Sequence, residues 1–390
     1  MGVKQKNYST RGSLSKGITD RSLPLILIFI FIFIYLFLTY TRIEAEVKIV
    51  SILKKNKATE STGDIKFKRY KQLEPEKKVK VGTVLNKGDQ LESLSKHIIL
   101  VIRCSDNPLS EFKFSEKFHI LVLPGDGKAC VFDLLGGSAD VLTGQPTSIS
   151  AGGETTMASE HTQYGVRIVP GEENGIRELF VYEGKVKIQS PGFTGSLDQG
   201  KKLIVSGKKP ASPIKIRQED FKRAAELYAR VSANMAQIII LERTSIQLTG
   251  PGRDRDRISA SVPTVRKVKN TAKELIPQFK ALYLDVFTNP TNPEYRLKLA
   301  TQQVNCHISH EAIYHSNLAE EYARVNLRKA TSALVKSIAF YQLNQSRNGY
   351  EEFMKAKEIE PSAFKDKNLK HYKFLKNLRK EIKKEYEKQK

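Results

Sequence analysis

The sequence predicts a multidomain α+β protein with three parts: a membrane helix or signal segment, an all-β domain of the sandwich or coiled-β type, and an α-helical C-terminal region. An uncharged run predicts the first part, apolar residues that alternate with period two predict the second, and a change to a period near 3.6 after Pro213 predicts the third. The expected segments are a basic leader 1–22, an apolar helix 23–41, a β-domain 46–210, a helix 218–248, a linker 249–262 and a helical region 263–390.

The net charge limits the kinds of partner. The chain has 390 residues, with 65 Lys and Arg against 42 Asp and Glu, which gives a formal net charge of +23. Such a surface attracts polyanions: phospholipid headgroups, acidic polysaccharide or nucleic acid. The location of the chain must decide among these three.

The first forty residues predict that location. The leader carries five basic residues and one acid, and an uncharged run from Ser22 to Thr41 follows it. A helix of 20 residues spans about 30 Å, which is the thickness of the hydrocarbon core of a bilayer. Basic residues before the run place the N-terminus inside and the rest of the chain outside. We therefore expect a single-pass inner-membrane protein with its bulk in the periplasm, which makes nucleic acid an unsuitable partner.

Two fates of the apolar segment stay open. Ile43 and Ala45 suit a signal peptidase, which would leave Glu46 as the new N-terminus of a soluble periplasmic protein. The length of the run and the charges of Arg42 and Glu44 favour a retained anchor.

Short strands are predicted across the β-domain. They are rich in Val, Ile, Leu and Phe, and Gly and Pro separate them: Val47–Leu53, His97–Cys104, Lys117–Leu123, Ala129–Leu135, Gln163–Val169, Arg177–Tyr182 and Lys185–Ser190. Gly136-Gly137 is interpreted as a turn, and the basic stretch from Lys54 to Lys80 as containing a surface loop. Gly184 predicts a two-residue hairpin between the last two strands, because it can supply a positive φ.

Several motifs in this region carry a family resemblance. They are Val81–Leu85 with Lys87–Leu91, Gly136–Leu142, Thr162–Val166, Val181–Val186 and Gln199–Lys201. In their order and spacing, residues 81–205 resemble a FecR domain, an extracytoplasmic module named after a regulator of ferric-citrate uptake. The resemblance implies a β-rich fold and an export address. It marks turn and strand positions at Gly88, Asp89, Gly136, Gly137, Thr162, Tyr164, Val166, Glu183 and Gly184.

The resemblance does not extend to regulation of a sigma factor. Members of the family with that role have a cytoplasmic helical domain before the membrane helix. Here only Met1 to Ser22 would be cytoplasmic, and chains shorter than about 40 residues rarely fold unaided.

Helices are predicted from Glu219 onward. Phe221, Ala224, Tyr228 and Val231 share one helix face. The segment 318–361 resembles one tetratricopeptide unit, and a plain helical hairpin is the alternative. The last helix, Ala363–Lys390, is strongly basic. It is interpreted either as a contact for anionic lipid or wall polymer, or as a solvated cationic face.

The three cysteines are the next candidates for chemistry. Cys104 and Cys130 lie in neighbouring predicted strands, where an oxidising compartment permits a disulfide; two small buried residues are the alternative. Cys306 begins a cluster with His307, His310, Glu311 and His315. The two histidines that flank the glutamate stand five residues apart, so they leave the helix in different directions and do not form a zinc-protease motif. Ordinary helix residues are favoured there over a metal site.

No catalytic motif is present in a suitable setting. The chain has no phosphate-binding loop, no nucleophile elbow and no dinucleotide fingerprint between a strand and a helix. We therefore expect no enzyme and no cofactor. The expected function is a membrane-anchored binding or scaffold protein with a protein or anionic envelope-polymer partner, and the alternative is an envelope signal-transduction component.

Overall fold

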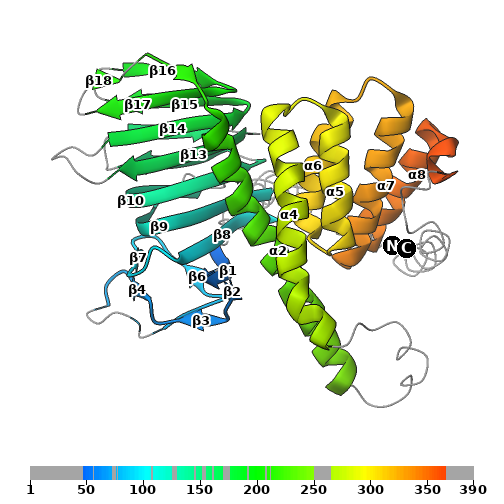
Figure 1. Ribbon diagram of the computed structural model, residues 1–390, viewed down its shortest axis with the longest axis horizontal. Helices are drawn as coiled ribbons and strands as arrows, with labels where there is room; N and C mark the ends of the chain where they lie inside the picture. The colour runs from blue at the N-terminus through cyan, green and yellow to red at the C-terminus, as the bar shows by residue number, and fades with distance from the viewer. Residues whose placement is uncertain are drawn as a thin grey trace, which may run out of the picture. The chain divides into compact units, whose positions relative to one another are not determined.

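The computed structural model describes residues 47–365, except 56, 73–75, 77, 107–108, 125–129, 145, 152–154, 160–161, 170–175, 191–192, 207–208, 211 and 250–264. The predicted leader, the apolar segment 23–41, nearly all of the linker 249–262 and the basic segment after residue 365 lie outside the described residues. Within them, the expected α+β organisation is confirmed: a large β region precedes the helices (Figure 1).

The β region is built mostly of antiparallel strands. They are β1 (Val47–Lys54), β2 (Lys57–Ala58), β3 (Ser61–Thr62), β4 (Ile65–Lys68), β5 (Val79–Lys80), β6 (Val84–Leu85), β7 (Gln90–Ser93), β8 (Ile98–Asp106), β9 (Leu109–Leu123), β10 (Cys130–Thr143), β11 (Thr147–Ala151), β12 (Thr155–Ser159), β13 (Thr162–Val169), β14 (Ile176–Glu183), β15 (Lys185–Ser190), β16 (Phe193–Asp198), β17 (Lys201–Ser206), β18 (Lys209–Pro210) and β19 (Ile214–Lys215). The stretch 54–80, which was predicted to contain a surface loop, contributes β2 to β5, and its residues 69–72 lie outside any strand and are mostly exposed.

The strands pair in two series that share β9 and β10. One series runs β2–β1–β8–β9–β10–β13–β14–β17, and β18 and β19 both pair with β17. The other runs β4–β7–β9–β10–β11–β12–β15–β16, in which only β10 and β11 are parallel. We call these the first and the second layer.

The shared strands fold the second layer over the first. Phe132 pairs with Val122 in the second half of β9, yet its ring lies 4.6 Å from that of Phe112 in the first half. In a straight strand, positions 112 and 122 would be about 33 Å apart. The strands bend where Glu116 and Lys117 take positive φ angles of 64° and 56°.

The expected turn at Gly136-Gly137 is wrong. Both glycines lie inside β10, at a bulge where the register with β9 shifts. Gly137 has φ of +85°, and a Cβ atom there would lie 2.6 Å from Cα of Phe118. The close approach of the two bent strands and the positive φ therefore both require glycine.

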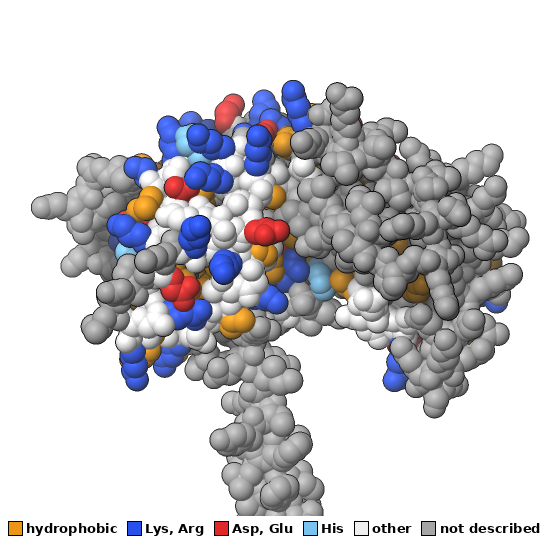
Figure 2. All heavy atoms as spheres, turned by 90° about the horizontal axis from the view of Figure 1, so that it is seen from below, with side chains coloured by type: hydrophobic (Ala, Val, Ile, Leu, Met, Phe, Trp, Pro, Cys, Tyr) orange, Lys and Arg blue, Asp and Glu red, His pale blue; other side chains and the backbone are white. Residues whose placement is uncertain are grey.

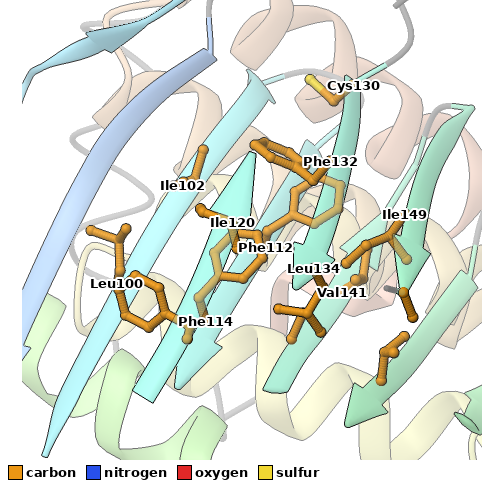
Figure 3. Packing of buried hydrophobic residues seen from close by; sticks show 14 of the residues in the cluster. Leu100, Ile102, Phe112, Phe114, Ile120, Cys130, Phe132, Leu134, Val141 and Ile149 are labelled. Atoms are coloured by element: carbon orange, nitrogen blue, oxygen red, sulfur yellow. The ribbon is translucent and has the colours of Figure 1, made fainter. Parts of the chain in front are cut away.

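The main hydrophobic core lies between the layers. Alternate residues of the first layer, such as Phe112 and Phe114, meet residues of the second layer, such as Phe132 and Ile120 (Figure 3). The first layer's opposite face has its own apolar residues and packs against helices.

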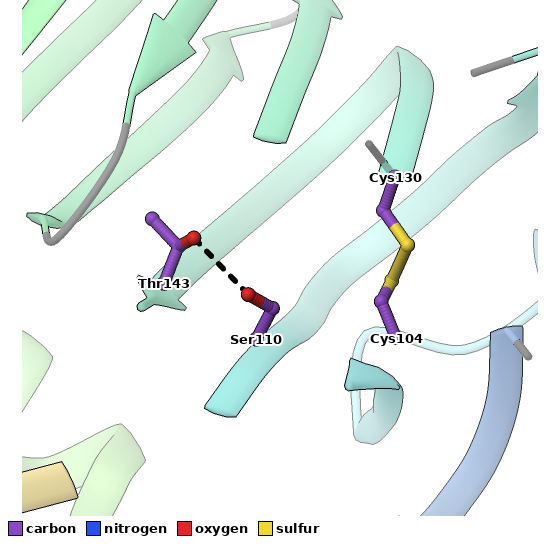
Figure 4. The surroundings of a disulfide bond; sticks show 4 residues. All are labelled: Cys104, Ser110, Cys130 and Thr143. Carbon is purple, nitrogen blue, oxygen red and sulfur yellow. Dashed lines mark hydrogen bonds between the residues drawn. A yellow bond between two sulfur atoms is a disulfide. The ribbon is translucent and has the colours of Figure 1, made fainter. Parts of the chain in front are cut away.

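A disulfide lies at the edge of this core. Cys104 in β8 and Cys130 at the start of β10 are bonded, with their Cα atoms 6.2 Å apart (Figure 4). In the same region Ser110 and Thr143 share a hydrogen bond of 3.1 Å across β9 and β10. The disulfide joins strands of the two pairing series, so it links the layers covalently.

The predicted hairpin at Gly184 is also wrong in its pairing. Gly184 has the expected positive φ of 76°, but β14 pairs with β13 and β17, whereas β15 pairs with β12 and β16. The chain therefore passes from the first layer to the second at this glycine.

Six helices follow in the described residues: α2 (Gln218–Thr249), α4 (Val265–Thr288), α5 (Pro293–Asn305), α6 (Ser309–Tyr322), α7 (Asn326–Gln342) and α8 (Ser346–Ile359), with a short 3-10 turn at Pro361–Lys365. Helix α2 crosses the first layer (Figure 1). Its buried face is rich in small residues, which allows close packing: Ala224, Ala225, Ala229, Ala233 and Ala236.

The later helices form consecutive antiparallel pairs with short connections. Asn292 caps α5 by accepting a hydrogen bond from the backbone N–H of Glu294, and Pro293 occupies the first turn. Helices α7 and α8 occupy the segment predicted to resemble one repeat unit, and α5 and α6 form a similar hairpin before it. Within the described part of the chain, no helix is long and apolar enough to cross a bilayer.

Candidate binding site between the sheet and helix α2

The outer face of the first layer is unusually polar for a covered surface. In β9, Glu111, Lys113 and Ser115 alternate with the core residues Phe112 and Phe114. Such alternation ordinarily indicates a strand with one face in water. Here helices cover that face, and Glu111 and Lys113 are fully buried.

Two of the buried charges on this face, Glu111 and Lys113, are paired with each other. Glu111 accepts hydrogen bonds from Lys113 at 2.6 Å and from Arg103 at 2.9 Å, and Lys113 Nζ lies 4.3 Å from the ring centre of Tyr228 in α2. Burial alone would raise the pKa of Glu111, but the charges of Lys113 and Arg103 lower it to about 2. The carboxylate stays ionised, and the cation–π contact ties α2 to the sheet.

A second buried carboxylate joins three helices. Glu311 in α6 accepts hydrogen bonds from Tyr283 in α4 at 2.7 Å, from Gln303 in α5 at 2.8 Å and from Ser232 in α2 at 3.3 Å. Burial is the largest influence on this carboxyl group, and the pKa of Glu311 is raised, whereas the pKa of Glu111 is lowered. A residue that the sequence placed in a histidine-rich cluster thus connects the helices.

A third group joins α5 to the sheet. Arg296 forms an ion pair with Glu183 at the end of β14, and Tyr322 in α6 donates a hydrogen bond of 3.2 Å to the same carboxylate. Arg296 also lies 3.1 Å from Nδ1 of His315. Burial and the charge of Arg296 lower the pKa of His315 well below its ordinary value, so the imidazole is neutral and accepts this hydrogen bond.

One part of the outer face stays hollow. A pocket of about 310 Å³ lies between the first layer and the N-terminal half of α2, and it is open to solvent. Its lining comes from the turn after β1, from the loop before β8 and the start of that strand, from β9, β10, β13 and β14, and from α2. This volume is near the lower end of the range for small-molecule sites, about 300–1,000 Å³.

Asp140 forms the most distinctive part of the pocket. It lies in the middle of β10, is only 9% exposed and accepts a hydrogen bond from the hydroxyl of Tyr182 in β14. Burial raises the pKa of Asp140 to about 7, although Lys113 and Arg167 act in the opposite direction. The carboxyl group therefore changes its charge near neutral pH.

Gly165 in β13 makes room for this pair. A Cβ atom at this position would lie 2.8 Å from the hydroxyl oxygen of Tyr182 and 3.0 Å from Oδ1 of Asp140. Any side chain would displace one of them. The glycine in the motif Thr162–Val166 therefore has a steric role in the pocket.

Cations line the middle and the mouth of the pocket. Glu116 joins Arg223 of α2, at 2.7 Å, to Arg167 of β13, at 3.5 Å. Lys55 and Lys96 also line the pocket and make no ion pair with the described residues. Figure 2 shows one face of the molecule on which Lys and Arg side chains predominate over Asp and Glu.

The motif residues marked by the family resemblance mostly lie elsewhere. Asp89 is buried and accepts hydrogen bonds from the backbone N–H groups of Tyr70, at 3.0 Å, and Asn86, at 2.9 Å. Gly88 has φ of +87°, and a Cβ atom there would meet the ring of Tyr70. These two positions therefore stabilise the connection between β6 and β7.

The remaining marked positions divide between the core and the helix contact. Thr162 and Tyr164 are fully buried in β13, and Tyr164 belongs to the core between the layers. Val166 belongs to that core and also borders the pocket. Glu183 forms the ion pair with Arg296. Of the marked residues, the structure therefore brings only Val166 to the pocket.

The cysteine–histidine cluster lies at the junction of α5 and α6 and in the first two turns of α6. Cys306 ends α5, and burial raises the pKa of its thiol to about 11. His315 and Glu311 point into different buried networks. Among the residues that the structure describes, no group of three or more His, Cys, Asp or Glu side chains is placed to hold a metal ion.

Sequence reasoning did not assign a role to Asp140, Arg167 or Arg223. Asp140 belongs to the motif Gly136–Leu142, which was interpreted for its strand pattern, and the two arginines were not singled out. A usable signal was present, because Asp140 is the single acid among small and apolar residues in 136–142. That signal gains meaning only once α2 is known to cover the strand.

Comparisons with known proteins give little further information. No protein-family model matches the chain, and no curated protein matches it. Two solved structures of a candidate anti-sigma factor from Parabacteroides distasonis are similar to part of it, at 11% and 15% sequence identity and with TM-scores of 0.26 and 0.23. Each alignment covers 36% of this chain and 62% of the solved chain, so the match spans less than two thirds of those structures.

Proposed function

We propose that this chain is a non-enzymatic binding protein of the bacterial envelope, in which the FecR-like β-domain and the helices jointly form a ligand site. The observation that carries the proposal is the pocket between the first layer and α2, with Asp140 and Tyr182 in its wall. A cavity with a few convergent polar groups and a carboxyl of shifted pKa is the usual form of a binding site.

The arrangement of polar groups favours binding over catalysis. The hydroxyls of Ser115 and Ser138 form a hydrogen bond of 2.8 Å with each other. Asp140 accepts a hydrogen bond from Tyr182, and burial raises the pKa of that tyrosine well above its ordinary value, so its hydroxyl stays protonated and is a weak nucleophile. A nucleophile within hydrogen-bond reach of a base is the arrangement that covalent catalysis needs. The pocket instead offers charges fixed by strands and a helix.

Export is part of the proposal. The basic leader and the apolar run 23–41 favour a single-pass inner-membrane protein with its bulk in the periplasm, or a cleaved soluble form. The disulfide between Cys104 and Cys130 supports this location, because such bonds persist in oxidising compartments. Segment 23–41 would then be the contact with the membrane, and nucleic acid would not be a partner.

The helical hairpins supply a second surface. Tetratricopeptide-like hairpins often hold protein segments, and α5 to α8 would present such a surface to a protein partner. The basic composition of the chain also suits an anionic envelope polymer.

Signal transduction is the second candidate function. The pocket lies between the sheet and α2, so a ligand inside it would touch both and favour one position of the helix. A retained N-terminal helix would be needed to pass that change across the membrane.

Protease access in cells tests the proposed location. In intact cells the described region should resist an added protease, and in spheroplasts it should be degraded while a cytoplasmic marker survives. Intact mass then distinguishes a retained segment 1–45 from a chain that begins near Glu46. Resistance to protease in spheroplasts, with recovery in the cytosol, would contradict the proposal.

A further inference from the structure

The pocket has opposite charges at its two ends. Helix α2 lies along it, and Asp220 and Arg230, which both line it, are ten residues apart, or about 15 Å of helix. Asp220 lies close enough to Tyr182 to help raise the pKa of that tyrosine, so it belongs to the end that contains Asp140. This acidic end is formed by β10, β14 and the first turn of α2.

The basic end lies beside β1 and β8. The backbone N–H of Lys55 donates to the carbonyl of His97, and Lys96 is the neighbouring residue. Ile99, at the start of β8, packs with Val231 of α2, which is next to Arg230. Across the sheet, two strand spacings from β8 to β10 separate the two ends by about 10 Å. Along α2, the distance from Asp220 to Arg230 is about 15 Å.

The charges between the ends already have partners. Arg223 and Arg167 are both paired with Glu116, and Arg167 also lies 3.4 Å from Glu178. Arg230 is paired with Glu226 at 2.9 Å. In the middle of the pocket, therefore, a ligand meets neutralised groups.

The charges at the ends form no ion pair with the described residues, although Lys55 lowers the pKa of Asp64, and Lys113 and Arg167 oppose the raised pKa of Asp140. Lys113, the neighbour of Asp140 across strands β9 and β10, donates a hydrogen bond to Glu111. Asp140 is bonded to the neutral hydroxyl of Tyr182. Lys55 and Lys96 form no ion pair within the described residues. The acidic end therefore suits a cation or a strong hydrogen-bond donor, and the basic end suits an anion.

We propose that this pocket binds a short zwitterionic peptide, with its ammonium group at Asp140 and its carboxylate at Lys55 and Lys96. The inference rests on the proposed binding function and names the ligand class for that site. At roughly 3.4 Å per residue, a separation of about 10–15 Å corresponds to a peptide of about two to four residues. Phe180 and Leu227 supply apolar contacts for its side chains.

The charge dependence of binding tests this assignment. The full-length chain in detergent micelles is titrated by calorimetry with trialanine, N-acetyl-trialanine and trialanine amide. The second probe lacks the ammonium group, and the third lacks the carboxylate. We expect trialanine to bind about tenfold more tightly than either blocked probe, since each lost charge pair is worth about one factor of ten.

Variants at the two ends should change this preference separately. Asp140→Asn should abolish the preference for trialanine over the N-acetyl probe and keep the preference over the amide. The double variant Lys55→Gln/Lys96→Gln should do the reverse. Lys57→Gln removes an exposed lysine of β2 outside the pocket and is the matched control, which should bind as the parent does.

Two results would overturn the proposal: no binding of trialanine at millimolar concentrations by folded protein, or equal loss of both preferences in either variant. Circular dichroism and unfolding midpoints establish that each variant is folded. A diastereomer of trialanine with a D-residue at its C-terminus separates the two sources of such peptides; tighter binding of it indicates wall peptides, and weaker binding indicates protein fragments. The calorimetry uses purified protein, so its result does not depend on where the protein lies in the cell. A failure to bind trialanine would leave the proposed envelope location standing, and a failure of the protease test would leave the measured binding standing.

Discussion

Arg296, in the first turns of α5, pairs with Glu183, the last residue of β14, and solvent reaches neither side chain. The pair connects the helical region to the sheet at the position where the chain leaves the first layer for the second. Tyr322 donates a further hydrogen bond to Glu183, and His315 accepts one from Arg296. Its loss should therefore weaken the contact between the β and α parts.

Substitution of Arg296 measures that contact. Arg296→Met would leave the Glu183 carboxylate buried without its counter-charge, so the free energy of unfolding should fall by about 3–5 kcal/mol. Urea unfolding followed by circular dichroism gives the value. Lys298→Met, which removes the exposed pair with Glu294 on the same helix, is the control and should cost about 0.5 kcal/mol or less. Equal effects of the two substitutions would refute the role assigned to the buried pair.

Asp140 should make stability depend on pH in the opposite direction to an ordinary paired carboxylate. Its pKa is raised from 3.8 to about 7 by burial, so the folded state holds a proton that the unfolded state has lost. The resulting stabilisation is complete below pH 3.8 and disappears as pH rises through about 7. Its full size is roughly 4 kcal/mol.

The Asp140→Asn variant isolates this contribution. Unfolding free energies of both proteins are measured between pH 5 and pH 8, where the parent should lose stability relative to the variant as pH rises. Asp198→Asn, at an exposed position, is the control. Parallel pH profiles for the parent and Asp140→Asn would show that the carboxyl group is not buried as described.

Gly165 should be intolerant of even a methyl group. Gly165→Ala would push on the Tyr182 hydroxyl and on Asp140, and such overpacking costs about 1–3 kcal/mol. Tyr182→Phe removes the hydroxyl, so the double variant should lose less than the sum of the two single changes. Gly136→Ala is the control, because its nearest atom lies at 3.9 Å and its φ is not positive. Strict additivity in the cycle would argue against the predicted clash.

The number of free thiols tests for the disulfide between Cys104 and Cys130. Purified, denatured protein should show one reactive thiol, that of Cys306, without reductant and three with it. Closure of a loop with a sequence separation of 26 residues should stabilise by about 3 kcal/mol, so reductant should lower the urea midpoint of the parent. The double variant Cys104→Ala/Cys130→Ala should not respond to reductant. Three thiols in the unreduced protein would rule the bond out.

The fold class followed from periodicity, because alternation and helical spacing are local properties of the chain. Strands β13 and β14 appear where Gln163–Val169 and Arg177–Tyr182 alternate, and α2 appears where Ala224, Tyr228 and Val231 share a face. The pairing of the strands could not be read in this way. Gly184 has the conformation that suits a hairpin, yet the partners of β14 and β15 are chosen by distant strands.

The pocket beside α2 could not be predicted from the sequence for a different reason. The alternation of Glu111 and Lys113 with phenylalanines predicts a charged face in water, which is the commoner outcome for an antiparallel sheet. The covering of that face by α2 depends on residues more than a hundred positions later, such as Arg223, which pairs with Glu116. Only the tertiary structure shows that Asp140 is enclosed.

Strands β9 and β10 belong to both layers, so the unfolding of one layer is coupled to the unfolding of the other. Neither layer has a complete set of hydrogen bonds without these two strands, so neither can melt while the other persists. We expect the sandwich to lose its structure in a single cooperative step, with no half-folded form that a cell's proteases would trim. The same sharing means that recombination could not exchange one layer between related proteins and leave the other intact.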